Sequence, residues 1–139
     1  MNRTLNWQTA HLRSIRDITA DIRLFEIEPH ERFTPPSPGS HINVNVHIEG
    51  RTTTRSYSLV GPCSDGIYRI AVKLLPESRG GSAYMWALAD GARLSISDPD
   101  NHFELFHGRP DYVLVAGGIG ITPIYSMAMA LYAKGVRFK

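Results

Sequence analysis

Short runs in which apolar and polar residues alternate fill most of the chain, from Trp7 to about Leu105. A period of two sends successive side chains to opposite faces, so each run indicates a half-buried β-strand rather than a helix. Turn residues between the runs favour antiparallel connections. We predict strands at His11–Asp17, Ile22–Pro29, His41–Ile48, Thr53–Leu59, Tyr68–Val72 and Arg93–Ser97. Six strands at this spacing favour a small closed antiparallel barrel, because closure removes the exposed edges of the sheet.

One helix interrupts this pattern between the fifth and sixth predicted strands, over Ser82–Ala89. Its first residue is a serine, which can cap the free N–H groups of a helix start. Tyr84, Met85 and Leu88 follow at helical spacing, and an Asp-Gly pair then stops the helix.

The pattern changes after Pro110, where residues 111–118 (DYVLVAGG) form a continuous apolar run ending in glycines. Such a run is typical of a strand buried on both faces in a parallel sheet. Thr122 is expected to cap a helix whose first residue is Pro123. The apolar face of that helix comprises Ile124, Met127, Ala128 and Leu131. Gly135 then ends the helix.

The last residues, Val136–Lys139, resemble the entry to a second parallel strand. A parallel sheet needs several strands covered on both faces, so one strand–helix unit is an incomplete domain. We therefore expect a mainly β fold with two parts: a barrel domain over residues 1–108, and the start of a truncated α/β nucleotide-binding domain over residues 109–139.

Composition and charge narrow the classes of partner. Of the residues, 42% are hydrophobic and 20% charged, and the net charge is +2, without a dense block of arginines. This balance argues against nucleic acid and favours a small anionic ligand. The start of the chain lacks the apolar core of a signal peptide, and no apolar stretch is long enough for a membrane span, so we expect a cytoplasmic protein.

Metal binding is not expected. The single cysteine, Cys63, excludes an internal disulfide and a cysteine-ligated metal or iron–sulfur centre built from this chain. His41 and His47 share a strand face, but a strand histidine is more often packed or solvated than a metal ligand. We assign no metal site and no catalytic acid, base or nucleophile.

The first candidate binding motif is Arg55-Ser56-Tyr57-Ser58-Leu59, in which strand alternation places Arg55 and Tyr57 on one face. This pair suits a ligand with a phosphate at one end and a flat ring at the other, since arginine holds phosphate by paired hydrogen bonds and tyrosine stacks on rings. A packed tyrosine and a solvated arginine on an ordinary barrel strand are the alternative.

The second candidate motif is Arg79-Gly80-Gly81-Ser82, directly before the predicted helix. Backbone N–H groups, the Ser82 hydroxyl and the Arg79 guanidinium would converge there on one anion. The alternative is a flexible loop followed by an ordinary helix cap.

The third candidate motif, Gly117-Gly118-Ile119-Gly120-Ile121-Thr122-Pro123, lies between a predicted strand and helix, where α/β folds bind nucleotides. Pro123 occupies the place of the last glycine in the dinucleotide fingerprint, so that standard fingerprint is absent. A plain strand–turn–helix junction also needs glycines and remains the alternative.

The order of these motifs carries a family resemblance. R-S-Y-S-L, Y-R-I-A-V-K, R-G-G-S and G-G-I-G-I-T-P follow one another as in the ferredoxin–NADP reductase superfamily, and the chain is most similar to its phthalate dioxygenase reductase and vanillate O-demethylase reductase group. The similarity covers nearly the whole chain, with high specificity from Pro38 onward.

The resemblance implies a flavin in a cleft between the barrel and the nucleotide domain. Arg55 would bind the flavin phosphate, Tyr57 would stack on the isoalloxazine ring, and Ser58 would donate a hydrogen bond near its reactive edge. The other implied contacts are the backbone of Ala71, Val72 and Lys73 on the ring, a phosphate loop of Arg79, Gly80, Gly81 and Ser82, and Gly117, Gly118, Gly120 and Thr122 at the nicotinamide. That phosphate loop favours FMN over FAD.

The resemblance also implies an activity. NADH or NADPH would deliver a hydride to flavin N5, and the flavin would pass electrons singly to an iron–sulfur acceptor or oxygenase of the Rieske type. A 2Fe-2S cluster is expected only if a further C-terminal domain exists, and this fragment alone is expected to show little turnover. A non-catalytic barrel module that binds FMN or a partner protein is the competing interpretation.

Overall fold

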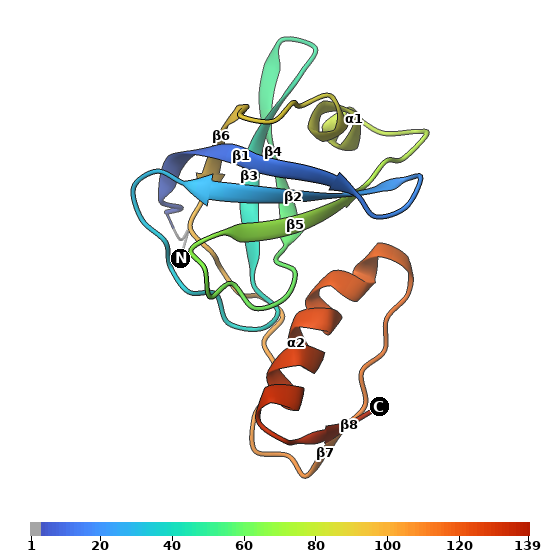
Figure 1. Cartoon of the computed structure of the whole chain (residues 1–139). Helices are drawn as coiled ribbons and strands as arrows, with labels where there is room; N and C mark the ends of the chain where they lie inside the picture. The colour runs from blue at the N-terminus through green and yellow to red at the C-terminus, as the bar shows by residue number, and fades with distance from the viewer. Residues whose placement is uncertain (1–3) are drawn as a thin grey trace.

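The computed structural model describes residues 4–139 and shows a curled β-sheet with a smaller helical part below it (Figure 1). Residues 1–3, which belong to the expected first domain, lie outside the described residues. The main sheet comprises β1 (Trp7–Asp17), β2 (Ile22–Pro29), β3 (His41–Ile48), β4 (Arg51–Ser58), β5 (Tyr68–Lys73) and β6 (Arg93–Ser97). All of its pairings are antiparallel, as expected from the alternating sequence pattern.

The order of the strands, β4-β3-β6-β1-β2-β5, leaves β4 and β5 as the two edges of a curled half-barrel. These edges meet just beyond the end of β4, where Leu59 bridges Ile70 and the Val60 N–H donates to the Arg69 carbonyl over 2.8 Å. Among the described residues no longer ladder joins β4 to β5. The two strands therefore separate on one side of this bridge, and a cleft opens between them.

The predicted strands agree closely with the observed ones, and β2, β3 and β6 have the predicted bounds. The largest difference is in β1, which begins at Trp7 instead of His11 because its first residues pair with β6. Gln8 is the reason why the alternating pattern did not predict this extension. It is a polar residue that is only 4% exposed, and its side-chain oxygen accepts the N–H groups of Glu31 and Arg32.

The core lies inside the curl of the sheet and is almost entirely aliphatic and aromatic. Its fully buried side chains include Phe25, Ile42, Ile70 and Ile96. Tyr68 is also fully buried, and its hydroxyl is satisfied by the backbone of Thr34. The barrel thus supplies a rigid frame for the residues at its β4–β5 opening.

The helix α1 (Gly81–Trp86) caps one end of the barrel through Met85, which is fully buried. The expected span, Ser82–Ala89, was too long at its C-terminus, since Ala87 is already the C-cap and the Leu88 N–H turns back to the Met85 carbonyl, three residues earlier. The expected serine cap is also wrong, because Gly80 occupies the N-cap position and no side chain caps the helix. Gly80 has φ of +105°, a conformation that glycine adopts without steric cost.

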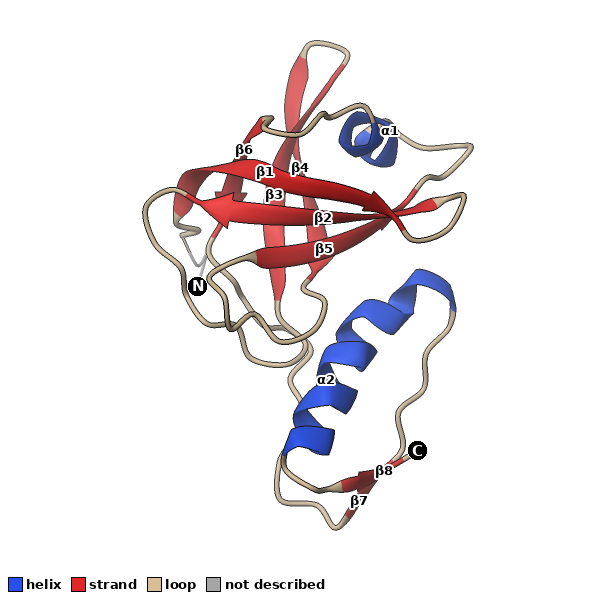
Figure 2. Cartoon of the chain, viewed as in Figure 1, coloured by secondary structure: helices blue, strands red, loops and turns tan. Residues whose placement is uncertain are grey.

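The C-terminal part contains β7 (Asp111–Tyr112), the short 3₁₀ turn η1 (Gly118–Gly120), α2 (Ile121–Ala133) and β8 (Arg137–Phe138), as Figure 2 shows by secondary structure. The strands β7 and β8 pair in parallel, as expected. The expected strand over residues 111–118 is wrong beyond Tyr112. Val113 and Val115 are 77% and 79% exposed, because β8 is the one strand that pairs with β7 among the described residues.

The helix α2 begins two residues earlier than expected, at Ile121 instead of Pro123. Thr122 therefore lies within the first turn, and its hydroxyl donates to the Ile119 carbonyl over 3.2 Å rather than capping the helix. At the other end, Gly135 has φ of +68° and the Val136 N–H bonds the Leu131 carbonyl, a Schellman-type termination. This stop at Gly135 agrees with the sequence pattern.

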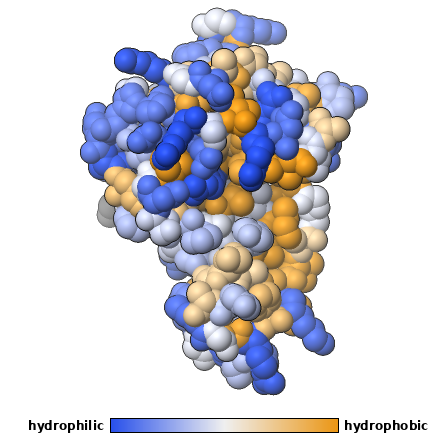
Figure 3. Space-filling view, viewed as in Figure 1, coloured by the Kyte–Doolittle hydropathy of each residue, from blue (hydrophilic) through white to orange (hydrophobic). Residues whose placement is uncertain are grey.

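Surface hydropathy differs between the two parts. In Figure 3 hydrophilic side chains gather on the left of the barrel, and hydrophobic surface runs from its right side down onto the part that carries α2. Exposed apolar side chains there include Ile121, Tyr125, Tyr132 and Phe138. Neither helix of residues 4–139 has the length and apolar character that crossing a bilayer requires.

Candidate functional site

The opening between β4 and β5 forms a cleft of about 670 Å³, and the N-terminal end of α2 closes one of its sides. This volume lies within the range of small-molecule and cofactor sites. Most of the cofactor-binding residues expected from the sequence line this one cleft. They are Arg55, Tyr57, Ser58, Ala71, Val72, Lys73, Arg79, Gly81, Ser82, Gly120 and Thr122.

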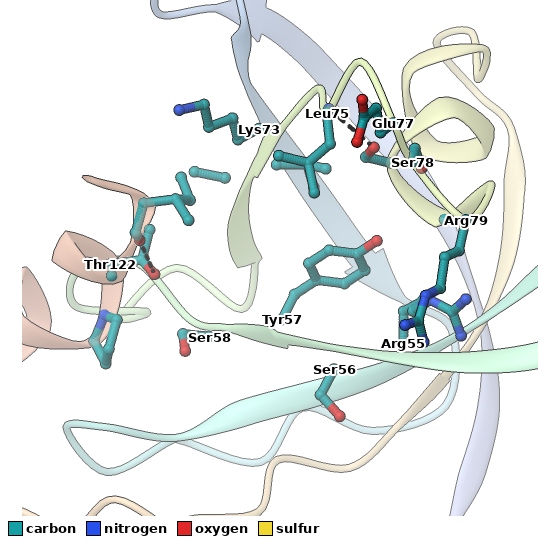
Figure 4. Close-up of a pocket in the computed structure, with 17 residues that line it drawn as sticks. Arg55, Ser56, Tyr57, Ser58, Lys73, Leu75, Glu77, Ser78, Arg79 and Thr122 are labelled. Carbon is teal, nitrogen blue, oxygen red and sulfur yellow. Dashed lines mark hydrogen bonds between the residues drawn. The ribbon is translucent and has the colours of Figure 1, made fainter. Parts of the chain in front are cut away.

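The residues are arranged along the cleft in a definite order (Figure 4). The side chains of Arg55 and Arg79 extend toward one another at one end, although they come from separate segments of the barrel. The ring of Tyr57 lies in the middle, and Thr122 on α2 marks the other end. One cleft therefore presents two cations, an aromatic surface and a hydroxyl in sequence.

Arg55 is held against the backbone of α1. A Cβ atom placed on Gly81 would lie 2.9 Å from Arg55 Nε and 3.1 Å from its Cγ, closer than side-chain atoms normally approach. Arg55 Nη1 donates to Thr53 Oγ1 and to the Thr54 carbonyl, at 3.3 and 3.1 Å. The glycine thus lets the arginine side chain pass across the helix start, and these bonds fix its direction.

Gly80 lies on the barrel side of the expected phosphate loop. It does not line the cleft; a Cβ there would lie 2.7 Å from Cγ2 of Ile48 on β3. Its N–H donates to the Ser78 hydroxyl over 3.0 Å. Gly80 therefore shapes the loop and allows it to pack on the barrel, while the neighbouring Gly81 faces the cleft.

Tyr57 combines a half-buried ring with a neutral hydroxyl. Its ring packs against the barrel core and also lines the cleft. Burial raises the pKa of Tyr57 above its ordinary value, and the positive charge of Arg55 offsets part of this rise. The side chain therefore remains an uncharged phenol at physiological pH, which suits stacking on a flat ring.

The opposite wall consists of Ala71, Val72 and Lys73 at the end of β5. Trp86 lies behind this wall, and its indole N–H donates to the Val72 carbonyl over 3.0 Å. The guanidinium of Arg23 covers the Trp86 ring, with 4.2 Å from Cζ to the centroid. The Val72 carbonyl is thus already engaged, and Trp86 ties α1 to the strand edge that lines the cleft.

Ser82 lines the cleft, and its hydroxyl also forms a hydrogen bond within the protein. Its hydroxyl accepts the N–H of Leu75 over 3.2 Å, which closes the loop between β5 and α1 (Figure 4). The loop itself brings Leu75, Glu77 and Ser78 into the wall, which sequence reasoning missed. In the sequence, only the position of Ser78 directly before the Arg79 motif pointed to these residues.

The glycine-rich segment before α2 lines the cleft only in its later residues. Gly117 and Gly118 are exposed, do not line the cleft, and have no atom within 4 Å of a Cβ position. Gly120 and Thr122 do line it, together with Ile119 and Pro123. The early helix start explains the difference, because η1 and the first turn of α2 present these later residues to the barrel.

Ser56 alternates with Arg55 and Tyr57 along β4. It lies at the rim of the cleft, but it also lines a second depression on the other side of β4 and donates a short hydrogen bond of 2.5 Å to the Asn43 side chain.

Within residues 4–139 no group of three or more His, Cys, Asp or Glu side chains is placed to hold a metal ion.

Known proteins are similar to this chain in sequence and in fold. The family model described as the oxidoreductase FAD-binding domain matches residues 9–105. Phenoxybenzoate dioxygenase subunit beta of Ectopseudomonas oleovorans is 44% identical over 119 residues, which are 83% of this chain and 36% of that protein. Vanillate O-demethylase oxidoreductase of Acinetobacter baylyi is 35% identical over 131 residues, or 92% of this chain and 41% of that protein.

A solved structure gives the same relationship in three dimensions. The solved structure of a phthalate dioxygenase reductase, described as a modular structure for electron transfer from pyridine nucleotides to [2Fe-2S], superposes with a TM-score of 0.84 and 35% identity. The match covers 95% of this chain and 41% of that one, so the chain spans about two fifths of the length of this relative. The resemblance found in the sequence motifs is confirmed, and the chain belongs to the oxidoreductase FAD-binding domain family, with the ferredoxin reductase-like fold.

Proposed function

We propose that the cleft binds a flavin nucleotide and that the chain is the flavin-binding part of a reductase. The arrangement of Arg55, Arg79 and Tyr57 is the observation that carries this proposal, because it places two cations and an aromatic surface in one cleft. A flavin nucleotide has the matching order of groups, with a phosphate at one end of a ribityl chain and a flat ring system at the other.

The two guanidinium groups are suited to the phosphate. Arginine offers several N–H donors in a planar fork, and charge-assisted hydrogen bonds to phosphate are about twice as strong as neutral ones. Gly81 has no side chain and therefore leaves Arg55 in place beside the phosphate position. Ser78 lies in the same wall and would supply a further hydroxyl.

We infer that the flavin is FMN. The family is named for FAD, whose adenylate half would have to continue past the two arginines. A phosphate monoester carries nearly two negative charges at neutral pH, and Arg55 and Arg79 match that concentration of charge at the end of the cleft. The complete Arg79-Gly80-Gly81-Ser82 loop, which the resemblance associates with FMN, supports the same choice.

A bound flavin would supply the redox chemistry, taking a hydride from a reduced nicotinamide and releasing the electrons singly. The residues of this chain would position the flavin ring and the nicotinamide ring. Tyr57 would hold the flavin ring, Ser58 would donate a hydrogen bond near its edge, and the α2 end with Gly120 and Thr122 would receive the nicotinamide. We propose residues 1–108 as the flavin-binding domain and residues 109–139 as the start of the nucleotide-binding domain.

The activity of the whole protein is a proposal by similarity. The relatives are named as parts of dioxygenase and demethylase systems, and this chain spans 36–41% of their lengths. We propose that the protein passes electrons from NADH or NADPH to an iron–sulfur acceptor or oxygenase. A plant-type 2Fe-2S domain in the rest of such a protein would provide the intermediate carrier.

Purification tests the proposal directly. The chain is expected to be yellow, with flavin absorbance in the blue, and to release a cofactor on denaturation whose mass identifies it as FMN. Release of FAD would contradict the FMN assignment but not flavin binding. A colourless chain that binds neither flavin on titration would contradict the proposed function and favour a non-catalytic module.

A further inference from the structure

We propose that Ser126 is a positioning residue, which fixes α2 on the barrel and so places the nicotinamide end of the cleft against Tyr57. This inference rests on the proposed flavin-reductase function. Ser126 lies one helical turn after Thr122 and is 8% exposed, although serine is usually a surface residue.

The Ser126 hydroxyl forms two hydrogen bonds to the segment that follows β4. It donates to the Leu59 carbonyl over 2.7 Å and accepts the Gly61 N–H over 2.9 Å. The Thr122 carbonyl, at 3.3 Å, is a weaker second acceptor within the helix. A single hydroxyl therefore satisfies two backbone groups of the barrel from the buried side of α2.

The segment that Ser126 contacts is itself buried and bonded to the barrel. Leu59 is 2% exposed, bridges Ile70, and its N–H donates to the Ser40 carbonyl over 2.9 Å. Leu59 also directly follows Ser58, which lines the cleft. Ser126 thus connects the helix that carries Thr122 to the strand that carries Tyr57 and Ser58.

The other contacts across this junction are less directional. Met127 packs beside Gly39, where a Cβ would lie 3.0 Å from its Cε, and the Tyr125 ring lies 3.6 Å from the Cβ position of Gly61. Within residues 4–139 no other side chain of α2 forms a hydrogen bond to the barrel strands or their loops. Apolar packing permits sliding and rotation, so the hydroxyl is the group that sets the orientation of α2.

The test compares Ser126→Ala with two matched variants. Ser126→Thr keeps the hydroxyl, and Ser64→Ala removes an exposed serine from the same β4–β5 connection. Hydrogen exchange reports the position of α2 without any cofactor. In Ser126→Ala the Gly61 amide should exchange about tenfold faster, because its acceptor is lost, while the amides of Phe25 and Ile70 in the barrel core should be unchanged.

The second measurement uses the flavin-loaded chain and an anaerobic hydride donor, a benzyl dihydronicotinamide, which has the reactive ring without the rest of the nucleotide. Ser126→Ala should retain flavin affinity within about twofold but lower the rate of flavin reduction by roughly 10-fold or more, because misplacement of one reactant is costly. Ser126→Thr and Ser64→Ala should reduce the flavin at the wild-type rate.

Two results would overturn the proposal: an unchanged Gly61 exchange rate in Ser126→Ala, or faster exchange with an unchanged rate of flavin reduction. The second result would leave Ser126 with a structural role only. A wild-type chain that binds no flavin contradicts the proposed function instead, and the exchange rate of Gly61 then decides whether Ser126 holds α2.

Discussion

Gly81 and Arg55 both line the cleft and pack so closely that a Cβ on Gly81 would stand 2.9 Å from Arg55 Nε. The two residues come from α1 and β4, and neither requires the other for its secondary structure. Their contact instead determines where one of the two cations of the cleft lies. This contact is a physical reason for a glycine at position 81, and it can be tested.

Gly81→Ala should lower flavin affinity about tenfold, because the new methyl group displaces the Arg55 guanidinium and weakens one charge-assisted hydrogen bond. The backbone at Gly81 is not in the left-handed region, so the fold should tolerate alanine. Fluorescence titration with FMN measures the effect. Gly117→Ala, in open space away from the cleft, is the control and should bind FMN like the wild type.

Arg79→Ala should weaken FMN binding by about 1.5–3 kcal/mol, the range for a hydrogen bond that involves a charged group. This corresponds to a roughly 10- to 150-fold increase in Kd. Arg51→Ala removes an exposed arginine of β4 that does not line the cleft, and thus controls for the change in net charge. Equal losses in the two variants would show that only overall charge matters.

Tyr57 should contribute through its ring and not through its hydroxyl. Tyr57→Phe should keep the wild-type affinity for flavin, whereas Tyr57→Ala should lose at least about 0.5–1.5 kcal/mol of stacking energy. Burial raises the Tyr57 pKa, so the phenol stays neutral and its titration should not alter Kd between about pH 7 and about pH 9. A Kd for Tyr57→Phe as weak as that of Tyr57→Ala would show that the hydroxyl is essential.

Asp65 gives a prediction on acid stability. A hydrogen bond from Arg69, which also contacts Glu26, lowers the pKa of Asp65 from 3.8 to about 2. Because the folded-state pKa is depressed, the contribution is complete above the unfolded value and is lost as the pH falls through about 2. The carboxylate is partly exposed, so solvent reduces the contribution.

Urea unfolding of the wild type and Asp65→Asn at several pH values measures this effect. The variant should be less stable near neutral pH, and the difference should shrink as the pH falls below the ordinary pKa of an aspartate. Asp90→Asn, which neutralises an exposed carboxylate after α1, is the matched control. A stability difference that persists unchanged to the lowest pH would assign the effect to something other than the charge of Asp65.

The sequence pattern predicted the barrel well because apolar and polar residues alternate along much of its strands and turn residues separate them. It failed where tertiary contacts override that pattern. Gln8 is buried as a polar residue because its side chain pairs with the backbone of Glu31 and Arg32. Val113 and Val115 have the composition of a buried strand, yet they are exposed, because β8 is the one strand that pairs with β7 in the described part of the chain.

The candidate site was predicted from motifs, and most of its expected residues share one cleft. The motifs did not distinguish residues that face the cleft from residues that shape its loops. Gly80 belongs to the second kind, because it packs on Ile48, and Gly117 and Gly118 remain exposed. Ser126 left no signal in the sequence, because a helical serine is ordinarily polar surface, and its role depends on Leu59 and Gly61 far away along the chain.

The most direct test of the central claim compares two flavins that differ only in the phosphate, FMN and riboflavin, by titration into the wild type and the Arg55→Ala/Arg79→Ala double variant. The wild type should bind FMN at least about 100-fold more tightly than riboflavin, since two charged hydrogen-bonding groups meet the phosphate. In the double variant this preference should largely disappear, while riboflavin affinity stays unchanged. Equal affinity of the wild type for the two flavins, or a preference that survives in the double variant, would contradict the account.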